Sequence, residues 1–232
     1  MRYKSVAAVL LIVGLLGWQL YRAGSNESAL PAELSSIVLP YTKPLEPFSL
    51  TDQEGQPFTL AHLQGRWSLL FFGYTHCPDV CPTAMGMLGG LFQRLQEQDP
   101  HSLANSQGVF VTVDPKRDTP TQLKQYVTYF NPGFKGLSGS EAEIKQFSRQ
   151  LGVYYNVPDT KEGKDSGAAG GSTKEEVPAI SHASSLFLID PLGRLVAIFP
   201  DYNKMEVLFD SYEKIRKAVR SHQTYANPDY NR

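Results

Sequence analysis

The stretch Phe71-Phe-Gly-Tyr-Thr-His-Cys-Pro-Asp-Val-Cys-Pro82 holds the only two cysteines of the 232-residue chain, Cys77 and Cys81. Its beginning belongs to an apolar run, Trp67 to Phe72, which is typical of a central strand covered on both faces. A helical pattern follows from about Thr83 to Gln98, so we expect both sulfurs at the end of a strand. Cysteines four residues apart lie on one face if the loop continues into a helix. The pair is therefore placed to share a bond or a ligand.

Three interpretations of this pair stay open on the residues alone. A structural disulfide would close a short loop and remove only about 2 kcal/mol of unfolded-state entropy, so it would be a weak staple. Thiol-disulfide chemistry suits exposed cysteines near a helix N-terminus, whose pKa values are lowered, although redox families usually leave two residues between them and this chain has three. The third interpretation is a soft metal site, in which two thiolates and a distant histidine bind copper or zinc.

The chain begins with a segment typical of a membrane anchor or a secretory signal. Residues 6–20 are almost wholly apolar, with Arg2 and Lys4 before them and Arg22 after them. This length is at the short edge of a bilayer span, and no Ala-x-Ala cleavage site follows. We therefore expect residues 1–24 to be an uncleaved single-pass anchor in a bacterial inner membrane. The charge bias predicts a cytoplasmic N-terminus, which places the rest of the chain in the periplasm.

The composition of the residues that follow this segment predicts a single domain. We expect a tether at residues 25–43, a domain at 44–222 and a polar tail at 223–232. Hydrophobic residues make up 41% of the chain, which is enough for one good core. Because the net charge is −1 and no basic stripe occurs, nucleic acid is not expected as a partner.

The domain alternates strand and helix patterns. Strands are predicted at residues 67–72, 108–113 and 153–157, and in two hairpins at 48–60 and 184–199. Helices are predicted at residues 83–98, 120–130, 140–151 and 205–222, the second and third from their capping boxes. Residues 158–177 are rich in Gly, Ser, Lys and Glu and are expected to form a surface insertion. This order predicts an α/β protein with a central sheet, flanking helices and an N-terminal β-hairpin.

A strand, a cysteine loop and a helix in this order look like a thioredoxin-like fold with a mixed central sheet. Three segments together resemble the SCO/SenC family: Gly73–Pro82, the run Val-Asp-Pro-Lys-Arg-Asp-Thr-Pro at 113–120, and Ser-His-Ala-Ser-Ser-Leu-Phe-Leu-Ile-Asp-Pro-Leu-Gly at 181–193. The resemblance runs from about Pro44 to His222. The combination of Cys-Pro-Asp-Val-Cys-Pro with Asp-Pro-x-Arg-Asp-Thr downstream is far more specific than a lone pair of cysteines.

This resemblance implies a membrane-anchored copper chaperone that helps to assemble the dinuclear copper centre of cytochrome c oxidase. It implies copper ligands at Cys77, Cys81 and His182. The implied partners are the copper-bearing subunit of the oxidase and another periplasmic copper carrier. The chemistry agrees, since two thiolates and an imidazole suit Cu(I), while the nitrogen ligand helps the site to tolerate Cu(II).

The main alternative is a thiol-disulfide reductase that acts on periplasmic target cysteines. In that case Cys77 and Cys81 are a redox-active pair, and no histidine is required. A peroxiredoxin-like peroxidase fits less well, because its pattern usually offers one cysteine in a Thr-x-x-Cys setting. The chaperone hypothesis does not make the protein an enzyme, whereas the reductase hypothesis does.

Residues next to the cysteines have plain structural explanations. His76 is expected to point away from the pair. Met85 and Met87 fit helix packing better than copper binding.

Four charged residues are weaker candidates for a supporting role. Asp79 and Asp114 are expected to form turns and caps or to tune the site. Arg117 and Asp118 are expected to contact a partner or to pair with each other.

Overall fold

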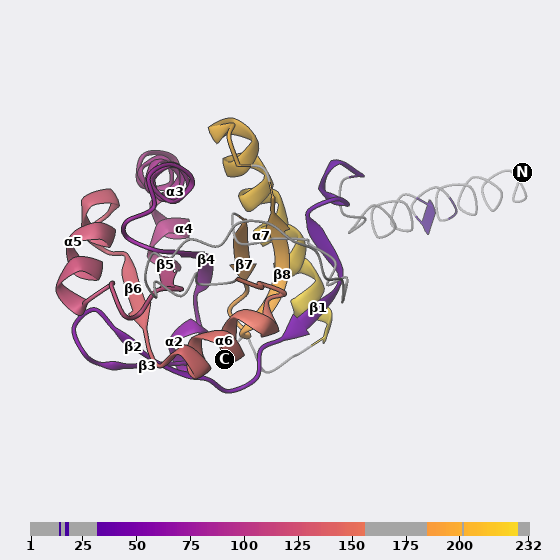
Figure 1. Ribbon diagram of the computed structural model, residues 1–232. Coiled ribbons are helices and arrows are strands. Elements are labelled where there is room, and N and C mark those ends of the chain that lie inside the picture. Colours follow the sequence, from indigo (N-terminus) through magenta and orange to yellow (C-terminus); the bar gives the residue numbers. More distant parts are fainter. Residues whose placement is uncertain (1–13, 15–16, 19–31, 156–184, 201, 227–232) are drawn as a thin grey trace, which may run out of the picture. The chain divides into compact units, whose positions relative to one another are not determined.

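The computed structural model describes residues 14, 17–18, 32–155, 185–200 and 202–226 (Figure 1). The strands are β1 Val38–Pro44, β2 Ser49–Asp52, β3 Pro57–Thr59, β4 Trp67–Gly73, β5 Ser106–Thr112, β6 Lys135–Ser138, β7 Leu186–Ile189 and β8 Arg194–Phe199. The helices are a 3-10 turn at Ala32–Leu34, α2 Leu60–Leu63, α3 Val80–Gln98, α4 Pro100–Ala104, α5 Pro120–Phe130, α6 Glu141–Gln150 and α7 Met205–Ala226.

The strands form one mixed sheet, in the order β1-β8-β7-β4-β5-β6-β2-β3. Strand β4 pairs in parallel with β5, and β5 pairs in parallel with β6. The neighbours on either side, β7 and β2, join this parallel centre in the antiparallel sense. The predicted mixed sheet with flanking helices is therefore confirmed.

Strand β4 is buried along its whole length, as its apolar run predicts, because helices cover both faces of the sheet. Leu70 and Phe72 belong to the core under α6, where the Phe72 ring lies 5.8 Å from that of Phe147. Helix α3 lies over the opposite face of the sheet (Figure 1). Phe71 belongs to that face, because successive side chains of a strand alternate between faces, and its ring is 6.3 Å from that of Phe110. This second face carries the cysteine pair.

Both predicted hairpins and both capping boxes are present. Strands β2 and β3 pair around the turn at residues 53–56, and β7 pairs with β8. In the second turn Gly193 has φ +76°, a left-handed conformation that glycine adopts without strain. Thr119 with Gln122 begins α5, and Ser140 with Glu143 begins α6.

The strand predicted at residues 153–157 is wrong for the part that the structure describes. Residues 153–155 are not in a strand, and Val153 is buried as a loop residue in the core. The third parallel strand is instead β6, whose sequence Lys-Gly-Leu-Ser has little strand character. Gly136 suits this position because an added Cβ would lie 3.1 Å from Val127 of α5.

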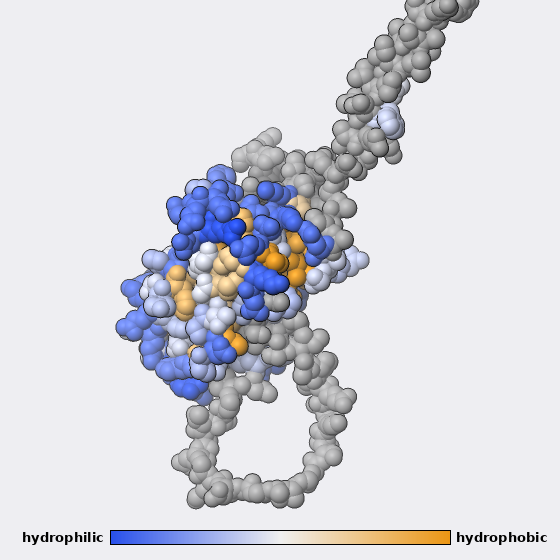
Figure 2. Space-filling model, turned by 90° about the horizontal axis from the view of Figure 1, so that it is seen from above, coloured by the Kyte–Doolittle hydropathy of each residue, from blue (hydrophilic) through white to orange (hydrophobic). Residues whose placement is uncertain are grey.

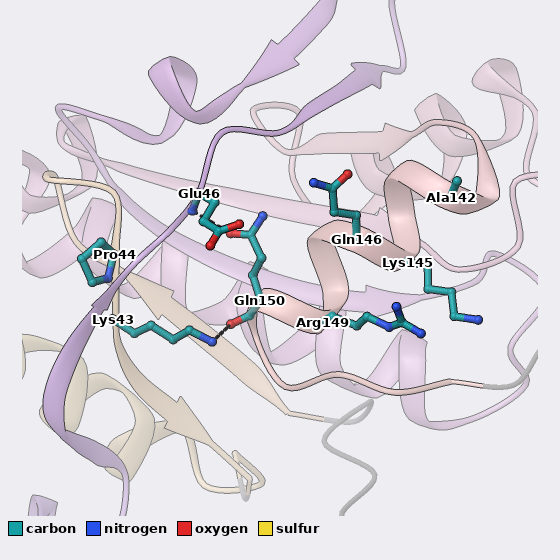
Figure 3. Close-up of a pocket in the computed structure, with 8 residues that line it drawn as sticks. All are labelled: Lys43, Pro44, Glu46, Ala142, Lys145, Gln146, Arg149 and Gln150. Carbon is teal, nitrogen blue, oxygen red and sulfur yellow. Dashed lines mark hydrogen bonds between the residues drawn. The ribbon is translucent and has the colours of Figure 1, made fainter.

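Strand β1 was not predicted, since most of it falls in the segment expected to be a tether. It carries Pro40 and Pro44, and among the described strands it pairs only with β8, as expected of proline in an edge strand. Gln150 ties the end of β1 to α6 (Figure 3). Lys43 Nζ donates to the Gln150 carbonyl at 2.7 Å, and the Glu46 N–H donates to the Gln150 side chain at 2.8 Å. A surface hollow of about 530 Å³ lies here, and neither cysteine lines it.

The chain divides into two compact units, residues 36–210 and the segments before and after them. In the second unit, Lys214 of α7 pairs with Glu33. No helix among the described residues is both long enough and apolar enough to cross a bilayer. Of the predicted anchor at 1–24, only residues 14, 17 and 18 are described.

Candidate metal and thiol site

Cys77 and Cys81 lie side by side at the junction of β4 and α3. Cys77 sits in the loop after β4, where its N–H donates to the Tyr74 carbonyl at 3.2 Å. Cys81 lies in the first turn of α3, and its N–H donates to the Cys77 sulfur at 3.4 Å. Both are free thiols, and they are 8% and 3% exposed. The predicted juxtaposition of the two cysteines is therefore present.

Gly73, the last residue of β4, makes room for the inner sulfur. An added Cβ at this position would lie 2.8 Å from Cys81 Sγ and 3.0 Å from the rings of Phe71 and Phe110. Real Cβ atoms do not approach other atoms so closely, so Cys81 can occupy its site only because residue 73 has no side chain. A glycine at a strand end often marks such a close approach.

We expect Gly73→Ala to displace Cys81 and to lower the free energy of unfolding by about 1–3 kcal/mol, as overpacking usually does. Urea unfolding of the reduced protein measures this change. The matched control is Gly86→Ala in α3, where an added Cβ meets nothing within 4 Å. That control should stabilise the protein by up to about 1 kcal/mol, because alanine is the better helix former. Equal stability of Gly73→Ala and the parent would contradict this account of the site.

The pKa values of the two thiols are shifted in opposite directions. Burial works against ionisation of Cys77, but hydrogen bonds from the Cys81 thiol and from the N–H groups of residues 79 and 81 outweigh it, so its pKa is lowered. The Tyr74 hydroxyl donates a further hydrogen bond to the same sulfur. Burial, together with the hydrogen bond to Cys77, raises the pKa of Cys81 to about 12. Of the two thiols of the reduced pair, Cys77 is therefore the one that loses its proton more readily, and the Cys81 thiol donates a hydrogen bond to its sulfur.

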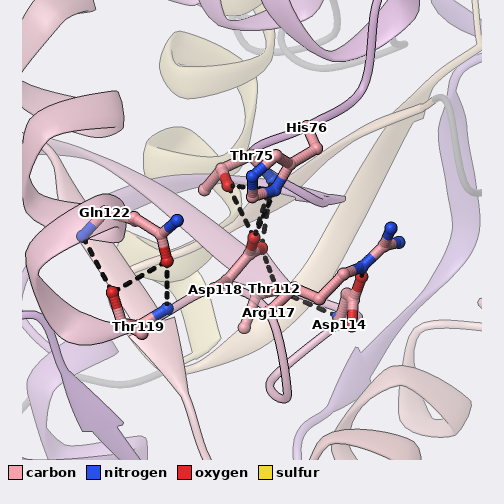
Figure 4. A network of polar contacts seen from close by, with 8 residues as sticks. All are labelled: Thr75, His76, Thr112, Asp114, Arg117, Asp118, Thr119 and Gln122. Carbon is pink, nitrogen blue, oxygen red and sulfur yellow. Dashed lines mark hydrogen bonds and ion pairs between the residues drawn. The ribbon is translucent and has the colours of Figure 1, made fainter.

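A buried carboxylate, Asp118, holds the cysteine loop to the end of β5 (Figure 4). It accepts hydrogen bonds from the Thr75 N–H at 3.0 Å, from the Thr75 hydroxyl at 2.6 Å and from the Thr112 hydroxyl. The Asp118 side chain is fully buried, so these donors replace the water that it loses. Asp118 thereby positions the residue two places before Cys77.

This network corrects one prediction. Arg117 does not pair with Asp118 but with Asp114, three residues before it. Asp114 also accepts the N–H groups of residues 117 and 118 on its carbonyl, as the turn interpretation predicts. The charges of Arg117 and Asp118 point in different directions because the loop between β5 and α5 turns between them (Figure 4).

Met85 and Met87 take the places that their structural explanations predict, whereas Asp79 does not. The His76 side chain is 51% exposed, and its Nδ1 lies 3.6 Å from Asp118 and 3.1 Å from the Thr75 hydroxyl oxygen. Met85 is fully buried in α3, and Met87 is partly buried. The cap predicted for the Asp79 side chain is wrong, because this side chain is exposed and makes no cap hydrogen bond. The group of Asp79 that contacts the site is its backbone N–H, which donates to the Cys77 sulfur.

Gly73, Tyr74 and Thr75 support the site and were not singled out from the sequence. All three lie inside the segment from 73 to 82 that carried the family resemblance, so that segment was the available indication. The segment alone does not show which residues Gly73, Tyr74 and Thr75 contact in the folded chain. Thr75 bonds a carboxylate 43 positions away, which only the folded chain shows.

The donor atoms fit a soft metal ion. Two adjacent sulfurs, with N–H groups that stabilise negative charge on one of them, match the preference of Cu(I) and zinc for thiolates. Among the residues that the structure describes, no three His, Cys, Asp or Glu side chains gather into a complete metal site. The predicted ligand His182 lies outside the described residues.

The sequence of the chain matches a known protein family and several known proteins. The SCO1/SenC family model matches residues 41–219. A Stutzerimonas stutzeri protein, whose name describes copper binding, is 35% identical over 185 residues, which are 80% of this chain and 83% of that protein. Mitochondrial SCO2 of Saccharomyces cerevisiae is 34% identical over 76% of this chain, but the match spans only 53% of the yeast protein.

The fold has matching solved structures. The crystal structure of Arabidopsis thaliana ScoI with copper bound aligns with a TM-score of 0.59 and 31% sequence identity. The alignment covers 74% of this chain and 98% of that one.

Proposed function

The chain belongs to the SCO1/SenC family, and we propose that it binds copper through Cys77, Cys81 and His182 and passes the metal to the dinuclear copper centre of cytochrome c oxidase. BsSco, whose fold matches that of this chain at 21% sequence identity, is a member of the Sco family of cytochrome c oxidase assembly proteins. The observation that carries the proposal is the pair of buried free thiols at the β4–α3 junction, held so that one sulfur accepts the N–H of the other cysteine.

The unequal acidities of the two thiols give copper uptake an order. Cys77, whose pKa is lowered, offers the first thiolate. Cys81 then loses its proton as the metal binds, because only the thiolate is a ligand. Copper, the cargo, is a soft cation that compensates the negative charge of the two sulfurs. His182 is proposed as the third ligand, which fixes the geometry of the site and stabilises Cu(II).

The partner is proposed to dock over the cysteine loop. The two sulfurs are almost fully buried, so a partner has to contact this loop to reach the metal that they hold. Val80, between the cysteines, is 50% exposed although it is apolar. On the face shown in Figure 2, hydrophobic patches lie between hydrophilic side chains. A small apolar contact of this kind suits a transient partner that must leave after transfer.

The proposal is tested by copper transfer. Reduced, copper-loaded protein is mixed with the purified soluble domain of the copper-bearing oxidase subunit, and copper on each protein is measured after separation. We expect copper to move to the subunit without appearing as free ion. If copper stays on the chaperone, or reaches the subunit no faster than free Cu(I) does, the delivery proposal fails.

A thiol-disulfide reductase is the second candidate, and the unequal thiols support it as well. A low-pKa thiolate on Cys77 can attack a target disulfide, and Cys81 can then resolve the mixed disulfide. The two functions differ in their need for His182.

We propose that residues 1–24 anchor the chain in a bacterial inner membrane, with the domain in the periplasm. The support is the charge bias of Arg2 and Lys4 against Arg22. N-terminal sequencing of membrane-extracted protein tests the anchor, because a sequence that begins after residue 22 would show cleavage.

A further inference from the structure

A surface groove of about 440 Å³ lies next to the cysteine pair. Thr75, His76 and Pro82 line it from the segment that carries the cysteines, and its other lining residues belong to α5. Among the described residues that line it, none is an acid, a lysine or an arginine. Its volume is in the range of ligand sites, which leaves room for the side chains of a docked segment. The groove therefore suits an uncharged occupant.

A row of four aromatic rings leads from the core of the protein to this groove. The Phe110 ring is fully buried, and its centroid lies 5.1 Å from that of Tyr126. Tyr126 lies 5.2 Å from Phe130, which in turn lies 5.1 Å from Tyr129. These separations are typical of favourable aromatic pairs. Because the row begins in the core, its outer rings are positioned before a partner binds, and less conformational freedom is lost on binding.

The outermost ring, Tyr129, is exposed more than packing requires. It is 85% exposed, although it packs on Phe130 and lines the groove. Single exposed apolar side chains are normal, and Tyr41 of β1, which is also 85% exposed and does not line the groove, is such a case. Tyrosine is enriched at protein interfaces and among the residues that contribute most to binding. Its place in an uncharged groove thus marks Tyr129 as a protein contact.

The position of the groove indicates which protein covers it. Cys77 and Cys81 are only 8% and 3% exposed, so a protein that takes copper from them must contact the residues around them. Those residues include Thr75, His76 and Pro82, which form one wall of the groove. The groove is therefore continuous with the surface that a copper acceptor has to cover.

We propose that this groove docks an uncharged, extended segment of the copper-accepting protein, which packs a prolyl or aromatic ring against Tyr129. Grooves lined by aromatic rings bind extended, proline-containing segments in other recognition domains. The assignment rests on the proposed copper delivery and adds a contact for its partner. Since Tyr129 is not a proposed copper ligand, it contributes to affinity for the partner and not to affinity for copper.

The test compares Tyr129→Ala with Tyr41→Ala in the full-length protein. Two dissociation constants are measured for each variant: that of the complex with the purified soluble domain of the copper-bearing oxidase subunit, and that of Cu(I) by competition with a chelator. We expect Tyr129→Ala to bind the subunit domain about tenfold more weakly, as loss of an aromatic interface residue implies, and to bind Cu(I) as the parent does. The weakening should be equal at low and high salt, because the contact is apolar.

Tyr41→Ala should match the parent in both measurements, and Tyr129→Phe, which keeps the ring, should bind the subunit domain nearly as well as the parent. The assignment is overturned if Tyr129→Ala binds the subunit domain within about twofold of the parent, or if Tyr41→Ala weakens binding equally. A parent that does not bind the subunit domain at all also overturns it.

Two other occupants of the groove would give different results. A weakening that disappears at high salt would indicate a charged segment, and self-association of the parent that Tyr129→Ala abolishes would indicate a second copy of this chain. Either result overturns the assignment. If the parent binds the subunit domain through Tyr129 but no copper moves, the proposed delivery fails instead, and the two failures are distinguished.

Discussion

Replacing His182 with alanine is expected to weaken Cu(I) binding by more than about a hundredfold and to abolish the Cu(II) form, while Cys77 and Cys81 still cycle between dithiol and disulfide. Loss of a residue that only orients a ligand already costs about 10–100-fold in metal affinity, so loss of a ligand should cost more. Disulfide exchange needs the two sulfurs and no histidine. Competition with a chelator measures the affinity, and thiol counting before and after oxidation measures the cycle.

The cysteine variants are the matched comparison. Cys77→Ser and Cys81→Ser should each lose copper binding and disulfide exchange, so they cannot separate the two candidate functions. His182→Ala can, provided that its helicity and melting temperature match those of the parent. If cells with His182→Ala assemble the oxidase normally at limiting copper while the cysteine variants do not, the reductase hypothesis replaces the chaperone.

Asp118→Ala is expected to lower the free energy of unfolding by about 3 kcal/mol or more. The change leaves the N–H and hydroxyl of Thr75 and the hydroxyl of Thr112 without their acceptor, and each buried unsatisfied group costs about 1–3 kcal/mol. The cysteine loop should also loosen, because Thr75 is its link to β5. Urea unfolding gives the stability, and alkylation of Cys81 in the reduced protein, which should become faster, reports the loosened loop.

Asp118→Asn is the graded control, since it keeps the shape and one acceptor oxygen but loses the charge. Its stability should fall between those of the parent and Asp118→Ala. If Asp118→Ala unfolds within about 1 kcal/mol of the parent, the carboxylate does not hold the loop.

The parts of the fold that sequence predicts well are those whose pattern is local. The unbroken apolar run of β4, the turn residues of both hairpins and the capping boxes of α5 and α6 each carry their signal within a few neighbouring residues. A local apolar pattern also gave a wrong prediction at Val153. The apolar residues there predict a strand, but Val153 lies in a loop and its side chain is buried in the core.

Strands β1 and β6 could not be predicted because the sheet, rather than their residues, makes them strands. Strand β6 has four residues, one of which is a glycine, yet it is stabilised by parallel pairing with β5 and by packing against α5. Strand β1 carries two prolines that only an edge position tolerates.

In the candidate site, too, local features can be predicted from the sequence and long-range contacts cannot. The cysteine pair can be found from its spacing and from the segment around it. Its supports are long-range: Asp118 meets Thr75 across 43 positions, and Phe110 of β5 and Cys81 of α3 meet beside Gly73 of β4. His182 remains a prediction from the resemblance.

The measurement that tests the central claim most directly is the copper content of the reduced full-length protein. The protein is reduced without air, equilibrated with Cu(I) in the presence of a weak competing chelator, and separated from unbound metal. The paired-thiolate site predicts one copper per chain, and none in Cys77→Ser or Cys81→Ser. Fully reduced protein that takes up no copper, or that keeps its copper when either cysteine is replaced, would contradict it.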